Sequence, residues 1–241
     1  MTRPFKPTNY IEIEGKKYIY LNDDNPSIAY QRLGVAFVAQ PLPYVSEQFN
    51  VVPVPLMMTD EWEIIKDDPN FVSELRHISG CEQDHRFNFT GQTGYMGREV
   101  FREMQDLEGY TFEETSPIYD LDPQTKRLHL KDFLRNIARS TFTFAPRGIG
   151  SSSFRAYQAM MVGSIPIITG MNDYPFKNEV DWDSICIRGK LEDIKTLTKK
   201  AVSMSHEEIK VMRGKAMLFW DNYCKHDSLY NKLEKISNAK N

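Results

Sequence analysis

Apolar and polar positions alternate along the chain in two ways, one typical of strands and one typical of helices. Short apolar or alternating runs predict strands at residues 86–90, 110–115, 140–145, 165–168 and 182–187. Helical spacing predicts helices at residues 98–107, 130–138, 154–162, 191–203 and 205–223. Because strands alternate with helices, we expect an α/β fold with a Rossmann-type parallel sheet covered on both faces.

The first part of the chain has a different pattern. Residues 1–60 are rich in proline and contain short β-like runs at 18–21, 35–38 and 50–54, whereas residues 59–77 have helical spacing. We place a domain boundary near Gly80. This gives an abbreviated N-terminal domain at 1–79 and a Rossmann-like domain at 80–241.

Composition limits the classes of partner. The 241 residues include 30 Lys and Arg against 33 Asp and Glu, so the net charge near -3 disfavours nucleic acid. No apolar run approaches the roughly 20 residues that span a bilayer, and the first residues lack the apolar stretch of a signal peptide. We expect a cytoplasmic protein, in the host cytoplasm if viral, or alternatively a trimmed ectodomain from the Golgi lumen. The three cysteines are far apart, which argues against disulfides and a zinc site and predicts buried thiols.

The loop between the strand at 140–145 and the helix at 154–162 carries the clearest candidate chemistry. It reads Pro146-Arg-Gly-Ile-Gly-Ser-Ser-Ser153, so backbone N–H groups, hydroxyls and the positive end of a helix dipole converge. In parallel α/β sheets this edge is where ligands bind, and a diphosphate suits such a site. The candidate ligand-binding residues here are Arg147, Gly148, Ser151, Ser152, Ser153 and Arg155. The alternative interpretation is a simple turn with a serine N-cap.

A second glycine-containing turn follows the strand at 86–90. Gly91 and Gln92 begin this turn, and Arg98 follows it by one helical turn. We predict that all three contribute to the same anion site. For Arg98 the alternative is an ordinary surface charge on a helix.

A longer order of residues resembles one known family. Ser140-x-Phe-x-Phe-Ala-Pro146, Ser153-Phe-Arg155, Gly163-Ser-Ile-Pro-Ile-Ile168, Asp173-Tyr-Pro-Phe176 and Trp182 resemble the signature of exostosin-family glycosyltransferases. The resemblance implies a GT-B fold, inversion at the anomeric carbon and no need for a divalent metal or other cofactor. It also implies a nucleotide-sugar donor, such as UDP-xylose, UDP-galactose or UDP-glucuronate, and a glycan or glycoprotein acceptor. A compact microbial or large-virus member of the family would fit.

The resemblance assigns further donor contacts and exposes one departure. Asn172 and Asp173 are expected to contact the base or sugar of the donor. Gln158 stands where the family usually has a glutamate that holds the donor ribose, so hydrogen bonding is kept but charge is lost. The triplet Asp181-Trp-Asp183 has the letters of a metal-diphosphate handle, but it lies at the family's Trp position and we interpret it as structural.

Inversion by direct displacement requires a general base near the acceptor hydroxyl. Our candidates are Asp60 and Glu61, which follow the apolar run at 51–58, and His85, which precedes the strand at 86–90. The alternatives are helix capping for the two acids and a solvated turn position for His85.

The sequence thus predicts an inverting glycosyltransferase. A non-catalytic module that binds a nucleotide or sugar phosphate is the main alternative, supported by Gln158. A small regulatory phosphate-binding domain is a third class, but it would have no reason to carry both the 163–168 and 173–176 elements.

Overall fold

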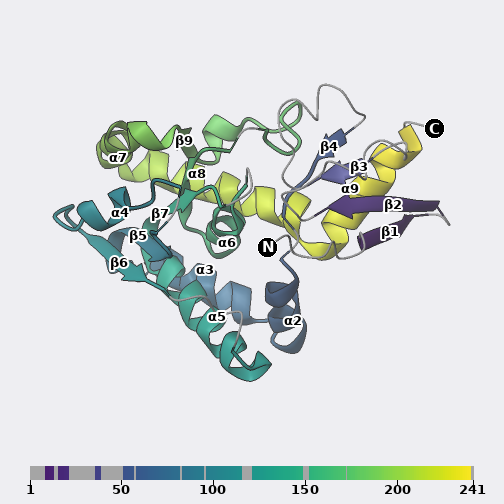
Figure 1. The fold of residues 1–241 in the computed structure, drawn as a ribbon, viewed down its shortest axis with the longest axis horizontal. Coiled ribbons are helices and arrows are strands. Elements are labelled where there is room, and N and C mark those ends of the chain that lie inside the picture. Colours follow the sequence, from purple (N-terminus) through teal and green to yellow (C-terminus); the bar gives the residue numbers. More distant parts are fainter. Residues whose placement is uncertain are drawn as a thin grey trace.

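The computed structural model describes residues 9–13, 16–21, 36–38, 51–56, 58–81, 83–94, 96–115, 121–148, 152–171 and 173–239. Its strands form two β-sheets, which lie toward opposite ends of the molecule in Figure 1. The larger sheet and its helices carry the candidate site.

The smaller sheet belongs to the N-terminal part of the chain. Its four strands are β1 (Asn9–Ile13), β2 (Lys16–Leu21), β3 (Ala36–Val38) and β4 (Val51–Pro53), and they lie in this order. The first pair is antiparallel and the other two pairs are parallel. The strands predicted at 18–21, 35–38 and 50–54 are therefore confirmed, whereas β1 was not predicted.

The larger sheet is entirely parallel. Its strands are β5 (His85–Gly91), β6 (Tyr110–Glu114), β7 (Ser140–Pro146), β8 (Ile165–Thr169) and β9 (Ile187–Gly189). They lie in the order β6-β5-β7-β8-β9. This order confirms the expected α/β class and its Rossmann-type sheet. The chain reverses direction across the sheet between β5 and β7, which makes the crevice at their carboxyl ends the topological switch point.

Helices cover both faces of this sheet. The α-helices are α2 (Thr59–Asp67), α3 (Phe71–Cys81), α4 (Val100–Glu103), α5 (Pro123–Ala138), α6 (Phe154–Val162), α7 (Ile194–Ser203), α8 (His206–Phe219) and α9 (His226–Ala239). One core cluster joins the sheet to α4 and α7 through aromatic side chains such as Phe89, Phe101 and Phe144. The other joins the opposite face to α3, α5, α6 and α8. The sheet therefore has one apolar core on each side.

Several element boundaries agree with the sequence patterns. Helix α6 spans the residues predicted for it, and Gly163 ends it with a φ of 91°, as a left-handed C-cap requires. Ser205 and Glu208 form the predicted capping box of α8. The helical segment at 59–77 is confirmed as two helices, α2 and α3, separated by residues 68–70.

Other predictions were wrong. Helix α4 has only four residues where ten were expected, and α5 begins at Pro123 because the Asp122 side chain accepts from two backbone N–H groups at its start. The strand predicted at 182–187 begins as a 3-10 turn, Trp182–Ser184, and only β9 is extended. A π-helical turn, Trp220–Cys224, ends α8, and α9 was not predicted. Cys81 is exposed rather than buried.

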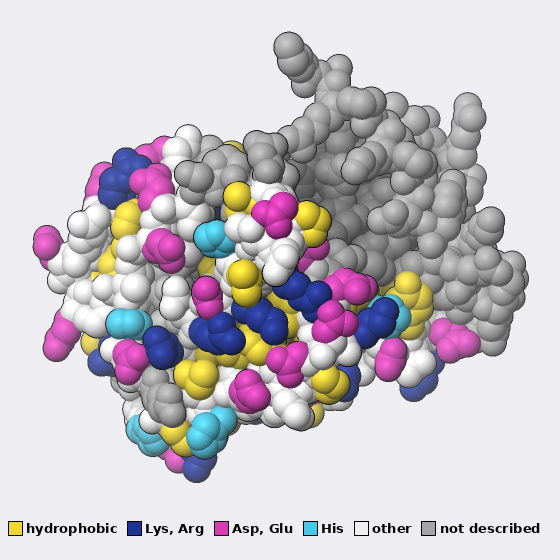
Figure 2. Space-filling view, turned by 90° about the horizontal axis from the view of Figure 1, so that it is seen from below, with side chains coloured by type: hydrophobic (Ala, Val, Ile, Leu, Met, Phe, Trp, Pro, Cys, Tyr) yellow, Lys and Arg dark blue, Asp and Glu magenta, His cyan; other side chains and the backbone are white. Residues whose placement is uncertain are grey.

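The surface mixes charges of both signs. Figure 2, which views the molecule from the lower side of Figure 1, shows Lys and Arg side chains interleaved with Asp and Glu side chains. Within the described part of the chain, no helix has both the length and the apolar character that a bilayer span needs. Helix α3 packs against α5 and α6, and the domain boundary near Gly80 stays a prediction.

Candidate functional site

The loops after β5 and β7 meet at one edge of the sheet. The two strands are paired neighbours, with Phe87 opposite Phe142, and they end at Gly91 and Pro146. Because the strands are parallel, Gly91 and Gln92 lie at the same edge as the loop that starts at Arg147. The two glycine-containing loops singled out in the sequence therefore come together at the switch point.

Arg98 ties these two loops to each other. Its guanidinium donates to the backbone carbonyl oxygens of Gln92 at 3.4 Å, of Pro146 at 3.3 Å and of Arg147 at 2.5 Å. Arg98 is only 6% exposed, so it is not the surface charge of the alternative interpretation. Arg98 therefore holds the loop at residues 146–153, the predicted anion loop, against the end of β5. Direct contact with a diphosphate stays a prediction.

Arg155 reaches the same edge from the first turn of α6. Its guanidinium lies over the rings of Phe89 and Phe133, at 5.2 and 5.5 Å from their centroids. A Cβ atom added to Gly91 would come within 2.8 Å of Arg155 Nη2. The absence of a side chain at Gly91 leaves room for this guanidinium beside the backbone at the end of β5.

Two backbone hydrogen bonds hold the loop that begins at Arg147, one to β8 and one within the loop. Arg147 N donates to Thr169 O at 2.8 Å, and Gly148 N donates to Ser152 O at 3.1 Å. Ser152 and Ser153 are buried beside the start of α6, and the hydroxyls of Ser152 and Tyr157 lie 3.4 Å apart.

Ser153 is the N-cap of α6, but its side chain makes no capping hydrogen bond. The interpretation of the loop as a simple turn with a serine N-cap therefore lacks the hydrogen bond on which it depends. Ser151 lies outside the described residues.

A pocket of about 210 Å³ adjoins this loop. It lies at the carboxyl ends of β7, β8 and β9, and it is lined by Pro146 and Arg147, by Thr169 and Gly170, by residues 190–192 and by Met96. Sequence reasoning named only Arg147 among these. The ends of β8 and β9 could have indicated the others, because ligands bind at the carboxyl edge of such sheets.

Two candidates that are 97 residues apart in the sequence, Glu61 and Gln158, meet where α2 contacts α6. Glu61, in the first turn of α2, is 5% exposed and accepts a hydrogen bond from Gln158 Nε2 at 2.5 Å. Burial raises the pKa of the Glu61 carboxyl, and the hydrogen bond from Gln158 partly opposes this. Gln158 itself is 8% exposed. The Glu61 carboxyl on α2 thus orients the Gln158 amide on α6.

The other predicted residues take no part in the contacts described above. Asp60 is exposed and forms an ion pair with Lys126 at 2.6 Å. Asp173 accepts from Lys177 Nζ at 2.8 Å, and Asn172 lies outside the described residues. His85 is the first residue of β5, so it lies at the amino edge of the sheet, roughly 20 Å from Gly91 at a strand rise of about 3.3 Å per residue. The structure does not bring His85 together with the other candidates.

The Asp181-Trp-Asp183 triplet makes structural contacts. The Asp181 side chain accepts from Asp183 N at 3.1 Å, while Asp183 pairs with Arg188 at 2.7 Å, which lowers the pKa of Asp183. Trp182 is buried and donates to Pro175 O at 2.9 Å. These contacts agree with the structural interpretation of the triplet.

Comparison with known proteins gives consistent matches. The Exostosin GT47 domain model matches residues 46–204. The Exostosin-1 homolog of Caenorhabditis elegans is 30% identical over 88 residues, which cover 36% of this chain and 23% of that protein. Exostosin-1 of Drosophila melanogaster is 26% identical over 117 residues, which cover 48% of this chain and 14% of that protein. The chain therefore matches less than a quarter of the length of either relative.

One solved structure has a distant likeness. It is the pneumococcal O-GlcNAc transferase GtfA in complex with UDP and GlcNAc, with a TM-score of 0.40 and 10% identity. The match covers 84% of this chain and 45% of that one.

Proposed function

Because the chain belongs to the Exostosin GT47 domain family of glycosyltransferases, we propose that it transfers a sugar from a nucleoside diphosphate carrier to a hydroxyl of a glycan or glycoprotein. The expected resemblance to exostosins is thereby confirmed at the level of the family. The carrier, the sugar, the acceptor and the stereochemical outcome belong to the proposal.

The observation that carries the proposal is that three arginines, Arg98, Arg147 and Arg155, lie at the carboxyl edge of the larger sheet around the switch point. Arg147 and Arg155 both belong to the loop and first turn between β7 and the body of α6, and Arg98 holds that loop against β5. Guanidinium groups and the N-terminus of a helix together stabilise a diphosphate. The same groups stabilise the negative charge that develops on a nucleoside diphosphate when it leaves the sugar.

We propose UDP as the carrier and a metal-independent reaction with inversion. In this mechanism Arg147 and Arg155 take the part that a divalent ion would otherwise play at the leaving group. The acceptor hydroxyl attacks the anomeric carbon, the bond to the diphosphate oxygen breaks, and a base accepts the hydroxyl proton.

Asp60 fits the role of base better than Glu61. Its side chain is 55% exposed, whereas Glu61 is buried and already accepts from Gln158. A base must reach the proton that it abstracts, so we assign Glu61 to orienting Gln158.

Binding of a nucleotide tests the proposal. We expect UDP to raise the melting temperature in the presence of EDTA, because a ligand that binds only the native state stabilises it. Arg147→Ala should weaken UDP binding by about tenfold or more, since a hydrogen bond to a charged group contributes about 1.5–3 kcal/mol. Arg139→Ala is the matched control, because Arg139 lies just before β7 at the opposite edge of the sheet. Equal binding by both variants would contradict the assignment of the site.

A second measurement separates the enzyme from a binding module. Gln158 is the feature that favours a non-catalytic module, because the family position usually carries an acid. Slow hydrolysis of a UDP-sugar without acceptor, reduced in Arg147→Ala, supports the transferase. Tight UDP binding with no turnover of any UDP-sugar, with or without glycan acceptors, would favour the module.

A further inference from the structure

Three side chains fasten the loop that follows β5 to the end of β6, and we call them the Thr93 cluster. The Thr93 hydroxyl donates to the Glu114 carboxylate and accepts from Arg102 Nη2 at 2.7 Å. Arg102 also donates to both oxygens of the Glu114 carboxylate, at 2.7 and 2.6 Å. Glu114 ends β6 and lies opposite Gly91 in the sheet, so the cluster lies at the carboxyl edge.

The hydrogen bonds of the cluster satisfy one another. Thr93 is fully buried, and its hydroxyl donates one hydrogen bond while it accepts another. The hydrogen bond from Thr93, followed by the contacts with Arg102, lowers the pKa of the Glu114 carboxyl. Glu114 is therefore ionised at neutral pH, which is the form that accepts from both partners.

The loop from Gln92 to Gly97 connects the cluster to the anion loop. Thr93 holds one end of it, and Arg98, directly after the other end, donates to Gln92 O and to two carbonyl oxygens of the anion loop. Between these anchors, Met96 and Gly97 have left-handed backbones, with φ of 59° and 74°. Such a backbone is uncommon for a methionine and persists only where its surroundings fix it.

We propose that Thr93, Arg102 and Glu114 are positioning residues for nucleotide binding, an inference that rests on the proposed function. The cluster fixes one end of the loop at 92–97. Arg98 transmits this order to the backbone of Arg147, whose side chain we assign to the diphosphate. The three residues act through the loop and do not touch the nucleotide.

The exposure of the cluster separates this role from a general contribution to stability. The side chains of Arg102 and Glu114 are 51% and 42% exposed, and exposed ion pairs contribute little to the free energy of unfolding. A surface loop, however, opens at a much smaller cost than the whole domain. A weak contact can therefore decide how often the loop is in place, and nucleotide affinity falls in proportion to that fraction.

Two substitutions break the cluster at different members. Glu114→Gln removes the charge that accepts from Arg102, and Thr93→Val removes the hydroxyl at nearly constant shape. Titration calorimetry would measure the Kd for UDP, and we expect each variant to lose about threefold to tenfold in affinity. Glu114→Gln should nevertheless change the melting temperature of the free protein by less than about 2 °C.

A conservative and a neighbouring substitution are the controls. Thr93→Ser keeps the hydroxyl and should therefore retain the wild-type affinity within about twofold. Glu113→Gln removes the same charge from the preceding residue of β6, which is exposed and points to the other face of the sheet. Its Kd for UDP should equal that of the wild type.

Each contrary outcome has its own meaning. Wild-type affinity in both Glu114→Gln and Thr93→Val would show that the cluster only closes the end of β6, which would overturn the inference. A loss in Glu114→Gln alone would overturn it as well, because the carboxylate would then act without the loop. Failure of the wild type to bind UDP or any other nucleoside diphosphate would overturn the proposed function itself, and the positioning role with it.

Discussion

The pair formed by Glu61 and Gln158 joins two segments that lie far apart in the sequence. Both side chains are almost fully buried, and the amide of one donates to the carboxyl of the other. Besides Gln158, the hydrogen bond from the backbone of Glu61 lowers the pKa of its carboxyl, the neighbouring Asp60 raises it, and Lys126 of α5 lowers it. Burial dominates, so the protein favours the protonated form of Glu61.

This leads to a prediction about pH. The pKa of Glu61 is raised above its ordinary value of 4.5, so above pH 4.5 the native state retains a proton that the unfolded state has released. The contribution of Glu61 to stability therefore falls as the pH rises through the window between 4.5 and the pKa in the folded protein. Glu61→Gln should gain in free energy of unfolding, relative to the wild type, across this window.

Urea unfolding at several pH values would measure the difference. Glu63→Gln is the matched control, because Glu63 is exposed on the same helix. Its difference from the wild type should stay constant with pH. A constant difference for Glu61→Gln as well would show that the buried carboxyl is not preferentially protonated.

The residue scale also shows what a sequence can and cannot predict about a site. The position of Arg147 and Arg155 at the carboxyl edge of the sheet could be predicted, because they flank a glycine-rich loop between a strand and a helix. The hydrogen bonds from Arg98 to the backbone of Pro146 and Arg147 could not be predicted, because they depend on how two loops meet at the switch point. His85 looked suitable only by residue type, and its place at the amino edge follows from the direction of β5.

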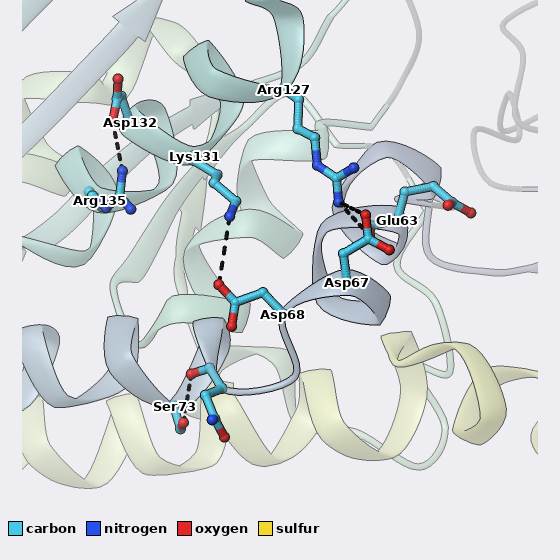
Figure 3. Close-up of polar contacts among 9 residues, drawn as sticks. Glu63, Asp67, Asp68, Ser73, Arg127, Lys131, Asp132 and Arg135 are labelled. Atoms are coloured by element: carbon cyan, nitrogen blue, oxygen red, sulfur yellow. Dashed lines mark hydrogen bonds and ion pairs between the residues drawn. The ribbon is translucent and has the colours of Figure 1, made fainter. Parts of the chain in front are cut away.

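At the scale of elements, a row of ion pairs fastens α2 to α5. Lys126 pairs with Asp60, Arg127 with Asp67 and Lys131 with Asp68, at 2.6, 2.6 and 3.6 Å. Figure 3 shows the second and third of these pairs, with Arg127 also close to Glu63, whose backbone oxygen accepts from it at 2.9 Å. The row keeps α2, and hence Glu61, in position over the helices of the larger sheet.

Because these pairs are exposed, we expect them to be weak and sensitive to salt. A double-mutant cycle with Arg127→Met and Asp67→Asn should give a coupling free energy of about 0.2–1 kcal/mol at low ionic strength. The coupling should shrink in 0.5 M NaCl, where screening acts over only a few ångströms. Coupling that is absent at low salt, or that persists unchanged at high salt, would contradict this account.

Element boundaries followed the sequence where the local signals were strong. Helix α6 has a glycine C-cap and lies between two buried strands, so its bounds could be predicted. Helix α5 begins at Pro123, two turns before the apolar pattern that predicted a start at residue 130. The reason is that Asp122 and Pro123 start the helix on an exposed surface, where no apolar residue marks it. Helix α9 was not predicted, because no capping residue or other sequence pattern marks the π-helical turn that separates it from α8.

At the scale of the whole molecule, Arg76 connects α3 to the C-terminal helices. Its guanidinium forms a bidentate pair with Asp221 in the π-helical turn, with both distances 3.0 Å, and donates to Met161 O at 2.9 Å. It also lies 5.6 Å from the ring centroid of Trp220. One residue thus links α3, α6 and the end of α8.

We predict that Arg76→Met lowers the free energy of unfolding by about 1–3 kcal/mol, since it removes hydrogen bonds from a partly buried carboxylate and a carbonyl. Asp221→Asn should cost less, because the contacts of Arg76 with Met161 and Trp220 remain. Chemical unfolding of both variants would measure the difference. If the two substitutions cost the same, the contacts other than the ion pair contribute nothing measurable.

The class of the fold followed from the alternation of strands and helices, but the order of the strands did not. Nothing in the local pattern of residues 110–115 places β6 at the edge of the sheet and β5 inside it. That order decides where the switch point lies, and therefore which loops form the site.

The positions of the three cysteines make this protein convenient to observe. Cys81 is exposed at the end of α3, four residues before β5 begins, so its thiol lies at the amino edge of the larger sheet. Cys186 and Cys224 are buried, and burial raises the pKa of both thiols, which keeps them out of the reactive thiolate form. A maleimide dye would therefore attach at one place, at the edge of the sheet opposite the loops that begin at Gly91 and Arg147, and leave these loops uncovered.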